Sequence, residues 1–220
     1  MRAYYFTSAE FALSNLVNKR IKISLLNELN DPYEFLGIDL SDKEFRRAFQ
    51  AGRDEAEKMS GVICFSKSWK NPLMWAHYAN KHTGMCLGFD VPDEHIIEVE
   101  YVSNLLKPVI NMNLKYGGLE ESYFKKVFNL KFKDWKYEKE VRVLVPKEEK
   151  HPSGYYFMDF EGNIELKEII LGQRCTTTYE DVKNHLHTYK SQIILFKSRI
   201  AFTKYEVVRN KSVEKYVHGA

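Results

Sequence analysis

The sequence lacks long hydrophobic runs, has few cysteines and carries almost no excess charge. No stretch approaches 18 consecutive apolar residues, about the length that a membrane-spanning helix needs. The N-terminus reaches Glu10 before an apolar run of signal-peptide length can form. Cys64, Cys86 and Cys175 form no CxxC pair, and their odd number argues against a disulfide scaffold. These absences predict a cytoplasmic protein without a membrane partner.

Glycine and proline are scarce as well. The 220 residues include 11 Gly and 6 Pro, which excludes collagen-like and low-complexity chains. Hydrophobic residues make up 44% of the chain, enough for a sizeable buried core. Because no internal repeat and no Ser/Gly-rich linker divides the sequence, we predict one domain over residues 1–220.

Charge is nearly balanced overall and uneven along the chain. The net charge of +3 is too small to indicate a nucleic-acid partner by itself. Residues 187–220, however, contain seven basic and two acidic residues. This basic C-terminal segment is either a solvated edge or a surface for a phosphate-rich partner such as nucleic acid.

The order of expected elements favours an α+β fold with mixed, mainly antiparallel sheets and flanking helices, because strands outnumber helices and do not alternate with them. Ser8, Asn71 and Thr178 are expected to cap helices, and Ser41 with Glu44 has the spacing of a capping box. Another helix is expected over residues 119–130. Expected strands include residues 3–6, 62–65, 84–91, 96–102, 140–145 and a hairpin formed by 155–160 and 165–171.

Common catalytic fingerprints are missing: the sequence contains no GxGxxG, GxxxxGK[ST], HExxH or GxSxG. The strongest polar cluster is WKYEKEVR, residues 135–142. In an extended chain Glu138, Glu140 and Arg142 point to one face. Two carboxylates so placed can perform acid/base chemistry, with Arg142 holding one of them. The alternative is an exposed, salt-bridged strand face.

Three further clusters are candidates. Ser66 and Ser68 follow an apolar strand, where hydroxyls can contact a ligand or simply shape a loop. His77 and His82 lie five residues apart, a poor spacing for one metal ion on a helix, so we predict no metal site. His77 and Tyr78 are instead expected beside a site. The turn at residues 30–34, NDPYE, could orient a ligand or remain a turn.

Taken in order, NDPYE, CFSKSWKNPLMWAHYANKHTGMCLGFD, WKYEKEVR and LKEIILGQR resemble a bacterial and phage-associated domain family of unknown function. The resemblance runs from Tyr4 to about Arg174. That family label implies no activity.

A more distant similarity is to ADP-ribosyltransferases. It rests on Tyr4-Tyr5-Phe6-Thr7 in a first strand, Ser66-Lys67-Ser68 at a strand end and Glu138-Lys139-Glu140 entering a later strand. The similarity implies a split sheet and NAD as substrate. Tyr5 takes a first-strand position that is Arg or His in those enzymes. The implied catalytic residues are Glu140 and Glu138, and the implied NAD-binding residues are Tyr5, Thr7, Ser66, Ser68, His77, Tyr78 and Arg142.

In this reading Glu140 stabilises an oxocarbenium-like state and Glu138 orients or deprotonates a macromolecular acceptor, a protein or nucleic acid. Such an enzyme would suit a toxin or a phage-defence effector. Two alternatives stay open: a nucleic-acid- or protein-binding defence module without catalysis, and a metal-dependent nuclease built on Asp31, Glu34, Glu138, Glu140 and the histidines.

Overall fold

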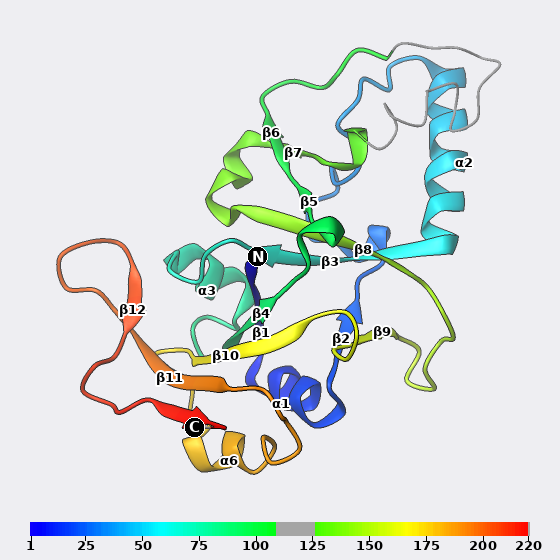
Figure 1. The fold of residues 1–220 in the computed structure, drawn as a ribbon. Coiled ribbons are helices and arrows are strands. Elements are labelled where there is room, and N and C mark those ends of the chain that lie inside the picture. Colours follow the sequence, from blue (N-terminus) through cyan, green and yellow to red (C-terminus); the bar gives the residue numbers. More distant parts are fainter. Residues whose placement is uncertain (109–125, 220) are drawn as a thin grey trace.

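A computed structural model describes residues 1–108 and 126–219 (Figure 1). The expected α+β fold with mainly antiparallel sheets is confirmed. Among the described residues, no helix is both long and apolar enough to cross a membrane.

The α-helices are α1 (Ala9–Asn18), α2 (Lys43–Met59), α3 (Pro72–Tyr78) and α6 (Tyr179–Lys183), and the 3₁₀ helices are η1 (Leu26–Glu28), η2 (Asp93–His95) and η3 (Lys133–Glu138). The strands are β1 (Arg2–Thr7), β2 (Arg20–Ile23), β3 (Ser60–Ser66), β4 (Met85–Asp90), β5 (Ile97–Glu98), β6 (Glu100–Val102), β7 (Leu130–Phe132), β8 (Glu140–Pro146), β9 (Tyr156–Asp159), β10 (Glu165–Leu171), β11 (Ile193–Ile200), β12 (Val207–Arg209) and β13 (Tyr216–His218).

The main sheet has the order β12-β11-β10-β4-β1-β3-β8-β5, and β13 pairs with β11 beside this path. Within it β10 and β11 run parallel, whereas the other pairs are antiparallel. Two short sheets, β2-β9 and β6-β7, complete the described part. The order places β1 and β3 side by side in the middle of the main sheet, although α1, β2, η1 and α2 separate them in the sequence.

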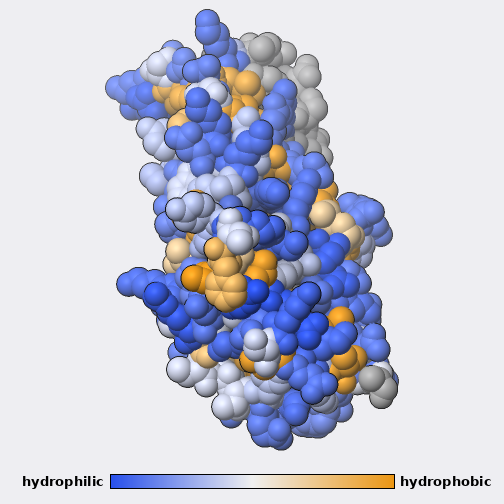
Figure 2. Space-filling model, turned by 90° about the vertical axis from the view of Figure 1, so that its left-hand side faces the viewer, coloured by the Kyte–Doolittle hydropathy of each residue, from blue (hydrophilic) through white to orange (hydrophobic). Residues whose placement is uncertain are grey.

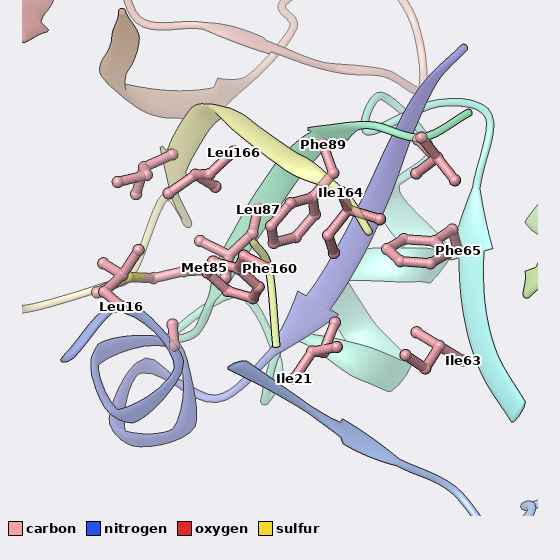
Figure 3. Packing of buried hydrophobic residues seen from close by; sticks show 14 of the residues in the cluster. Leu16, Ile21, Ile63, Phe65, Met85, Leu87, Phe89, Phe160, Ile164 and Leu166 are labelled. Carbon is pink, nitrogen blue, oxygen red and sulfur yellow. The ribbon is translucent and has the colours of Figure 1, made fainter. Parts of the chain in front are cut away.

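Both faces of the main sheet are buried, because alternate residues of its central strands pack into different clusters. On one face Ile63 and Phe65 join a core that α1, α6, β2 and β9 cover. Figure 3 shows this core, where the rings of Phe89 and Phe160 lie 4.9 Å apart. On the opposite face Val62 packs with α2, while α3 covers the neighbouring strands. A strand buried on both faces leaves no solvent-exposed side for polar residues.

Two strand predictions are wrong for the same reason. The turn between residues 160 and 164 exists, since Phe160 O accepts hydrogen bonds from the amides of Asn163 and Ile164. However, β9 pairs with β2 and β10 pairs with β4 and β11, so they form no hairpin. Residues 96–102 likewise divide into β5, which pairs with β8, and β6, which pairs with β7. Distant partners, which local sequence does not report, decide these pairings.

Helix starts follow the sequence more closely. Ser8, Asn71 and Thr178 cap α1, α3 and α6 as expected, and Thr178 forms its capping box with Asp181. At α2 the prediction of Ser41 is wrong, because Asp42 is the N-cap and accepts a hydrogen bond from the Phe45 amide at 2.7 Å. Most of the helix expected over residues 119–130 lies outside the described residues.

The cap of α2 can be tested directly. Asp42→Ala should lower the free energy of unfolding by about 0.5–2 kcal/mol, because the Phe45 amide loses its acceptor. Ser41→Ala is the control and should stay within about 0.5 kcal/mol of wild type. Urea unfolding monitored by circular dichroism measures both, and equal losses would contradict the assignment of Asp42.

Candidate functional site

The three motifs of the sequence meet in one row across the main sheet. Tyr4 on β1 lies opposite Ser66 on β3, and Ser66 lies opposite Glu140 on β8. Directly opposed residues of neighbouring strands point to the same face. The side chains of Tyr4, Ser66 and Glu140 therefore lie on the same face of the main sheet, in which β3 lies between β1 and β8 (Figure 1).

The first-strand residue in this row is Tyr4 and not the expected Tyr5. Successive side chains of a strand point to opposite faces, so Tyr5 turns toward the main core. Its ring makes an edge contact with Phe65 at 6.1 Å between centroids, and burial raises its pKa to about 12. Tyr5 still lines part of a cavity beside this row.

A lysine that the sequence analysis did not single out stands at the centre of the site. Lys131 Nζ lies 2.8 Å from Glu34 Oε1, 2.6 Å from Glu138 Oε2 and 2.6 Å from Glu140 Oε2. All four side chains are at most 4% exposed. One ammonium thus joins the 30–34 turn, β7, the end of η3 and the start of β8.

Arg142 forms the second cationic centre. Its Nε donates to Glu140 Oε1 at 2.6 Å, and its Nη2 donates to Glu34 Oε2 at 2.5 Å. Its Nη1 donates to the carbonyl of Phe128 at 2.8 Å. The strand-face alternative, exposed and salt-bridged, is wrong because Arg142 is 1% exposed and Glu140 4%. The cluster holds three carboxyl groups against two cations.

The two glutamates of the ExE motif have opposite pKa shifts. Burial by itself would raise the pKa of Glu140, but Arg142 and Lys131 outweigh it and hold that pKa at about 2. For Glu138 burial prevails over the attraction of Lys131, and its pKa is raised. Such a pair combines a permanently charged carboxylate with one that can take up and release a proton.

Glu138 is also the end of a short polar chain. Tyr78 OH donates to Glu138 Oε1 at 2.5 Å, and Asn30 Nδ2 donates to Tyr78 OH at 3.1 Å. Burial and Glu138 together raise the pKa of Tyr78, so its hydroxyl stays protonated as a donor. Ser66 Oγ donates to the backbone carbonyl of Glu138 at 2.5 Å. Ser66 therefore fixes the backbone that carries Glu138.

A cavity of about 190 Å³ opens beside this network. Its lining comprises Tyr4, Tyr5, Phe6, Ser24, Leu29, Asn30, Glu34, Cys64, Phe65, Ser66, Met74, Tyr78, Lys131, Glu138 and Glu140. An aromatic ring fits a cavity on the order of 150 Å³. The space therefore suits one ring-sized group in contact with Glu138 and Glu140.

The remaining expected residues lie around the cavity without lining it. Thr7 is buried at the end of β1, next to the start of β4. Ser68 donates its amide to Ser66 Oγ at 3.2 Å. His77 contacts the rings of Tyr78 and Tyr137, with centroids 6.1 and 6.2 Å away. Arg142 does not line the cavity, but its guanidinium contacts two residues that do, Glu34 and Glu140.

Two residues of the site were not singled out from the sequence, Tyr101 and Lys131, and two others, Asn30 and Glu34, entered only as alternatives. Asn30 and Glu34 belong to a turn for which a ligand role was an open alternative. Tyr101 OH accepts a hydrogen bond from the Glu140 amide at 2.8 Å. The sequence gives little indication that Lys131 is buried at a site, beyond its place between the apolar residues Leu130 and Phe132 on a short strand.

The arrangement disfavours the metal-dependent nuclease. Among residues 1–108 and 126–219, no group of three potential ligands is placed to hold a metal ion. The position between Glu34, Glu138 and Glu140 is taken by the Lys131 ammonium.

One known protein family matches the part of the chain that carries most of this site. Residues 74–143 match the family described as "Protein of unknown function (DUF2971)". The resemblance to an uncharacterised domain family is thereby confirmed for this stretch. No curated protein and no solved structure matched the chain. The DUF2971 match runs from α3 into β8 and includes Tyr78, Lys131, Glu138, Glu140 and Arg142, so it spans the ion network except for Glu34.

The central role of Lys131 gives a prediction about stability. Lys131→Met leaves buried carboxylates without their shared cation, and should lower the free energy of unfolding by about 3–5 kcal/mol at pH 7. The loss should shrink as the pH falls, because protonated carboxyl groups no longer repel one another.

Lys67→Met is the matched control. The Lys67 partner, Glu98, is 70% exposed, so breaking that pair should cost at most about 1 kcal/mol. Urea unfolding at several pH values measures both variants. Equal losses at pH 7 would show that the ion network is not a major contributor to stability.

Proposed function

We propose that the protein is an ADP-ribosyltransferase-like enzyme that cleaves NAD at the nicotinamide–ribose bond and transfers ADP-ribose to a macromolecular acceptor. The observation that supports this most is the pair of buried glutamates at one cavity, Glu140 with a lowered pKa and Glu138 with a raised one. Reactions that pass through an oxocarbenium-like state use such pairs. A role as a toxin or phage-defence effector is part of this proposal.

Glu140 is the group that stabilises positive charge. When the C1′–N1 bond of NAD breaks, both electrons leave with neutral nicotinamide and positive charge develops on the ribose. A carboxylate that is already ionised and held by Arg142 and Lys131 needs no rearrangement to interact with that charge. The third carboxyl group of the cluster leaves one negative charge in formal excess, which favours a cationic ligand over an anionic one.

Glu138 is the group that takes up the acceptor's proton. As the acceptor's oxygen or nitrogen attacks C1′ and forms the new bond, its proton passes to Glu138. The raised pKa of Glu138 makes it a better base than an ordinary surface carboxylate. Tyr78 donates to its other oxygen and holds the carboxyl group in place.

The cavity fits the departing ring. Its volume of about 190 Å³ is too small for a whole dinucleotide but sufficient for nicotinamide. Tyr4 and Tyr78 offer rings in its wall for contact with the nicotinamide face. The adenosine part of NAD would then lie outside the cavity, on the surface of the protein.

Replacement of Glu140 tests the activity. Glu140→Gln should lower the rate of nicotinamide release from NAD by roughly a hundred- to a thousand-fold, because the ionised group beside C1′ is lost. Glu55→Gln on the exposed surface of α2 is the control and should leave the rate unchanged. Chromatography of nicotinamide during incubation with NAD and a cell extract measures the rates. No release by the wild type, together with no NAD binding by calorimetry, would refute the proposal.

The role of Glu138 predicts a pH dependence. The raised pKa means that more of Glu138 is protonated at a given pH than for a free glutamate of pKa 4.5, and only its ionised form is a base. Transfer should therefore accelerate as the pH rises through the pKa of Glu138, and Glu138→Gln should remove this dependence. Tyr78→Phe removes a hydrogen bond that favours the ionised form, so the midpoint should move to higher pH. An unshifted midpoint in Tyr78→Phe would contradict the assignment of Glu138 as the base.

A further inference from the structure

The loop between β11 and β12 carries the two most exposed aromatic side chains of the described residues. Tyr205 is 99% exposed and Phe202 is 86% exposed. Ile200, at the end of β11, is 49% exposed beside them. Rings placed fully in solvent contribute nothing to the packing of this chain, so the fold alone does not account for them.

The loop is a defined structure that presents these rings outward. Arg199 and Val208 pair across the two strands, as do Ile200 and Val207. The amide of Ala201 donates to the carbonyl of Glu206 at 2.8 Å and closes the loop. The ladder therefore holds the base of the loop in place below the exposed rings.

Basic side chains surround the rings. The Arg199 guanidinium lies 4.3 Å from the centroid of the Phe202 ring. Lys204 lies between the two rings in sequence and pairs with Glu206. Lys70, whose carbonyl accepts the Val207 amide, is 3.6 Å from the same Glu206. Two of these cations, Lys70 and Lys204, share the Glu206 carboxylate, whereas Arg199 lies over a ring. We call Lys70, Arg199, Phe202, Lys204 and Tyr205 the β11–β12 tip.

We propose that the β11–β12 tip binds single-stranded nucleic acid. Flat exposed rings are stacking platforms for unpaired bases, and the excess of cations suits the phosphates between those bases. A stable protein partner would need a continuous surface of about 800 Å² on this side. Figure 2, turned to the side on which β12 lies, shows instead several small, separate hydrophobic patches on a mainly hydrophilic face.

Two aromatic rings on β9 provide a comparison for the exposure of the rings at the tip. Tyr156 and Phe157 are each covered by a cation of this chain: Lys147 over Tyr156 and Arg20 over Phe157, at 5.1 and 3.9 Å from the ring centroids. At the tip Arg199 lies over Phe202 in the same way, but Tyr205 has almost its whole surface free. The tip is therefore the better platform for an incoming base.

The tip is connected to the candidate site by the segment that follows β3. Ser66 ends β3 beside Glu138, and three residues later the Trp69 ring contacts Phe196 of β11 at 5.5 Å. The next residue, Lys70, accepts a hydrogen bond through its carbonyl from the Val207 amide of β12. The proposal does not depend on the NAD reaction, because none of the tip residues lines the cavity.

Fluorescence anisotropy with labelled 16-nucleotide oligo(dT) and oligo(U) tests the proposal. The wild type should bind at 50 mM salt, and roughly 7- to 20-fold more weakly at 200 mM if two or three phosphates are contacted. Phe202→Ser with Tyr205→Ser should weaken binding at least about fivefold, because base stacking is lost. Phe11→Ser, which removes a ring that is 62% exposed on α1, should have no effect.

A second pair of variants separates charge from stacking. Arg199→Gln with Lys204→Gln should reduce the salt dependence of binding, whereas Lys43→Gln with Arg47→Gln on the exposed surface of α2 should not. Glu140→Gln should bind oligonucleotides like the wild type, so failure of the NAD proposal leaves this one intact. No binding at 50 mM salt, unchanged binding by the ring variant, or binding to anionic lipid vesicles in its place would overturn the proposal.

Discussion

The contact on which the rest of the site depends is that of the Lys131 ammonium with three carboxyl groups. Each partner comes from a different part of the chain: Glu34 from a turn, Glu138 from the end of η3 and Glu140 from β8. Separately, none of these charges could be buried to a few percent exposure without a large desolvation penalty. Together they fix how the turn, η3 and β8 lie against one another, and so they fix the wall of the cavity.

The same contact explains why two neighbouring glutamates differ chemically. Glu140 has two cations, Lys131 and Arg142, whereas Glu138 shares only Lys131 and otherwise meets the neutral hydroxyl of Tyr78. With three carboxyl groups for two cations, one carboxyl group must be less well compensated, and this is Glu138. The excess of carboxyl groups over cations is therefore enough to explain why Glu138 can accept a proton while Glu140 stays ionised.

Local chemistry in the sequence predicted the local structure well, and failed where partners are remote. Helix caps at Ser8, Asn71 and Thr178 depend on hydrogen bonds within three residues, and the sequence shows those directly. The supposed hairpin of β9 and β10 failed because strand pairing depends on segments elsewhere in the chain. At the site, a resemblance implied that the segments of Tyr5, Ser66 and Glu140 lie at one cleft, but the sequence by itself could not show that these segments meet. The sequence also did not show that Tyr4, and not Tyr5, shares a face with Ser66 and Glu140. Lys131 could not be identified from the sequence because its role depends on its contacts with residues such as Glu34. Only the fold brings these residues close to it.

The row of Tyr4, Ser66 and Glu140 has a consequence for synthesis of the chain. The strands that carry it are β1, β3 and β8, and β8 leaves the ribosome long after the other two. Until then Glu34 has neither Lys131 nor Arg142 as a partner and must remain hydrated, so the 30–34 turn cannot settle into its final place. A nascent chain that stops short of Lys131 lacks the cation that the three carboxyl groups share. The ion network therefore cannot be completed during translation until β7 and β8 have been made.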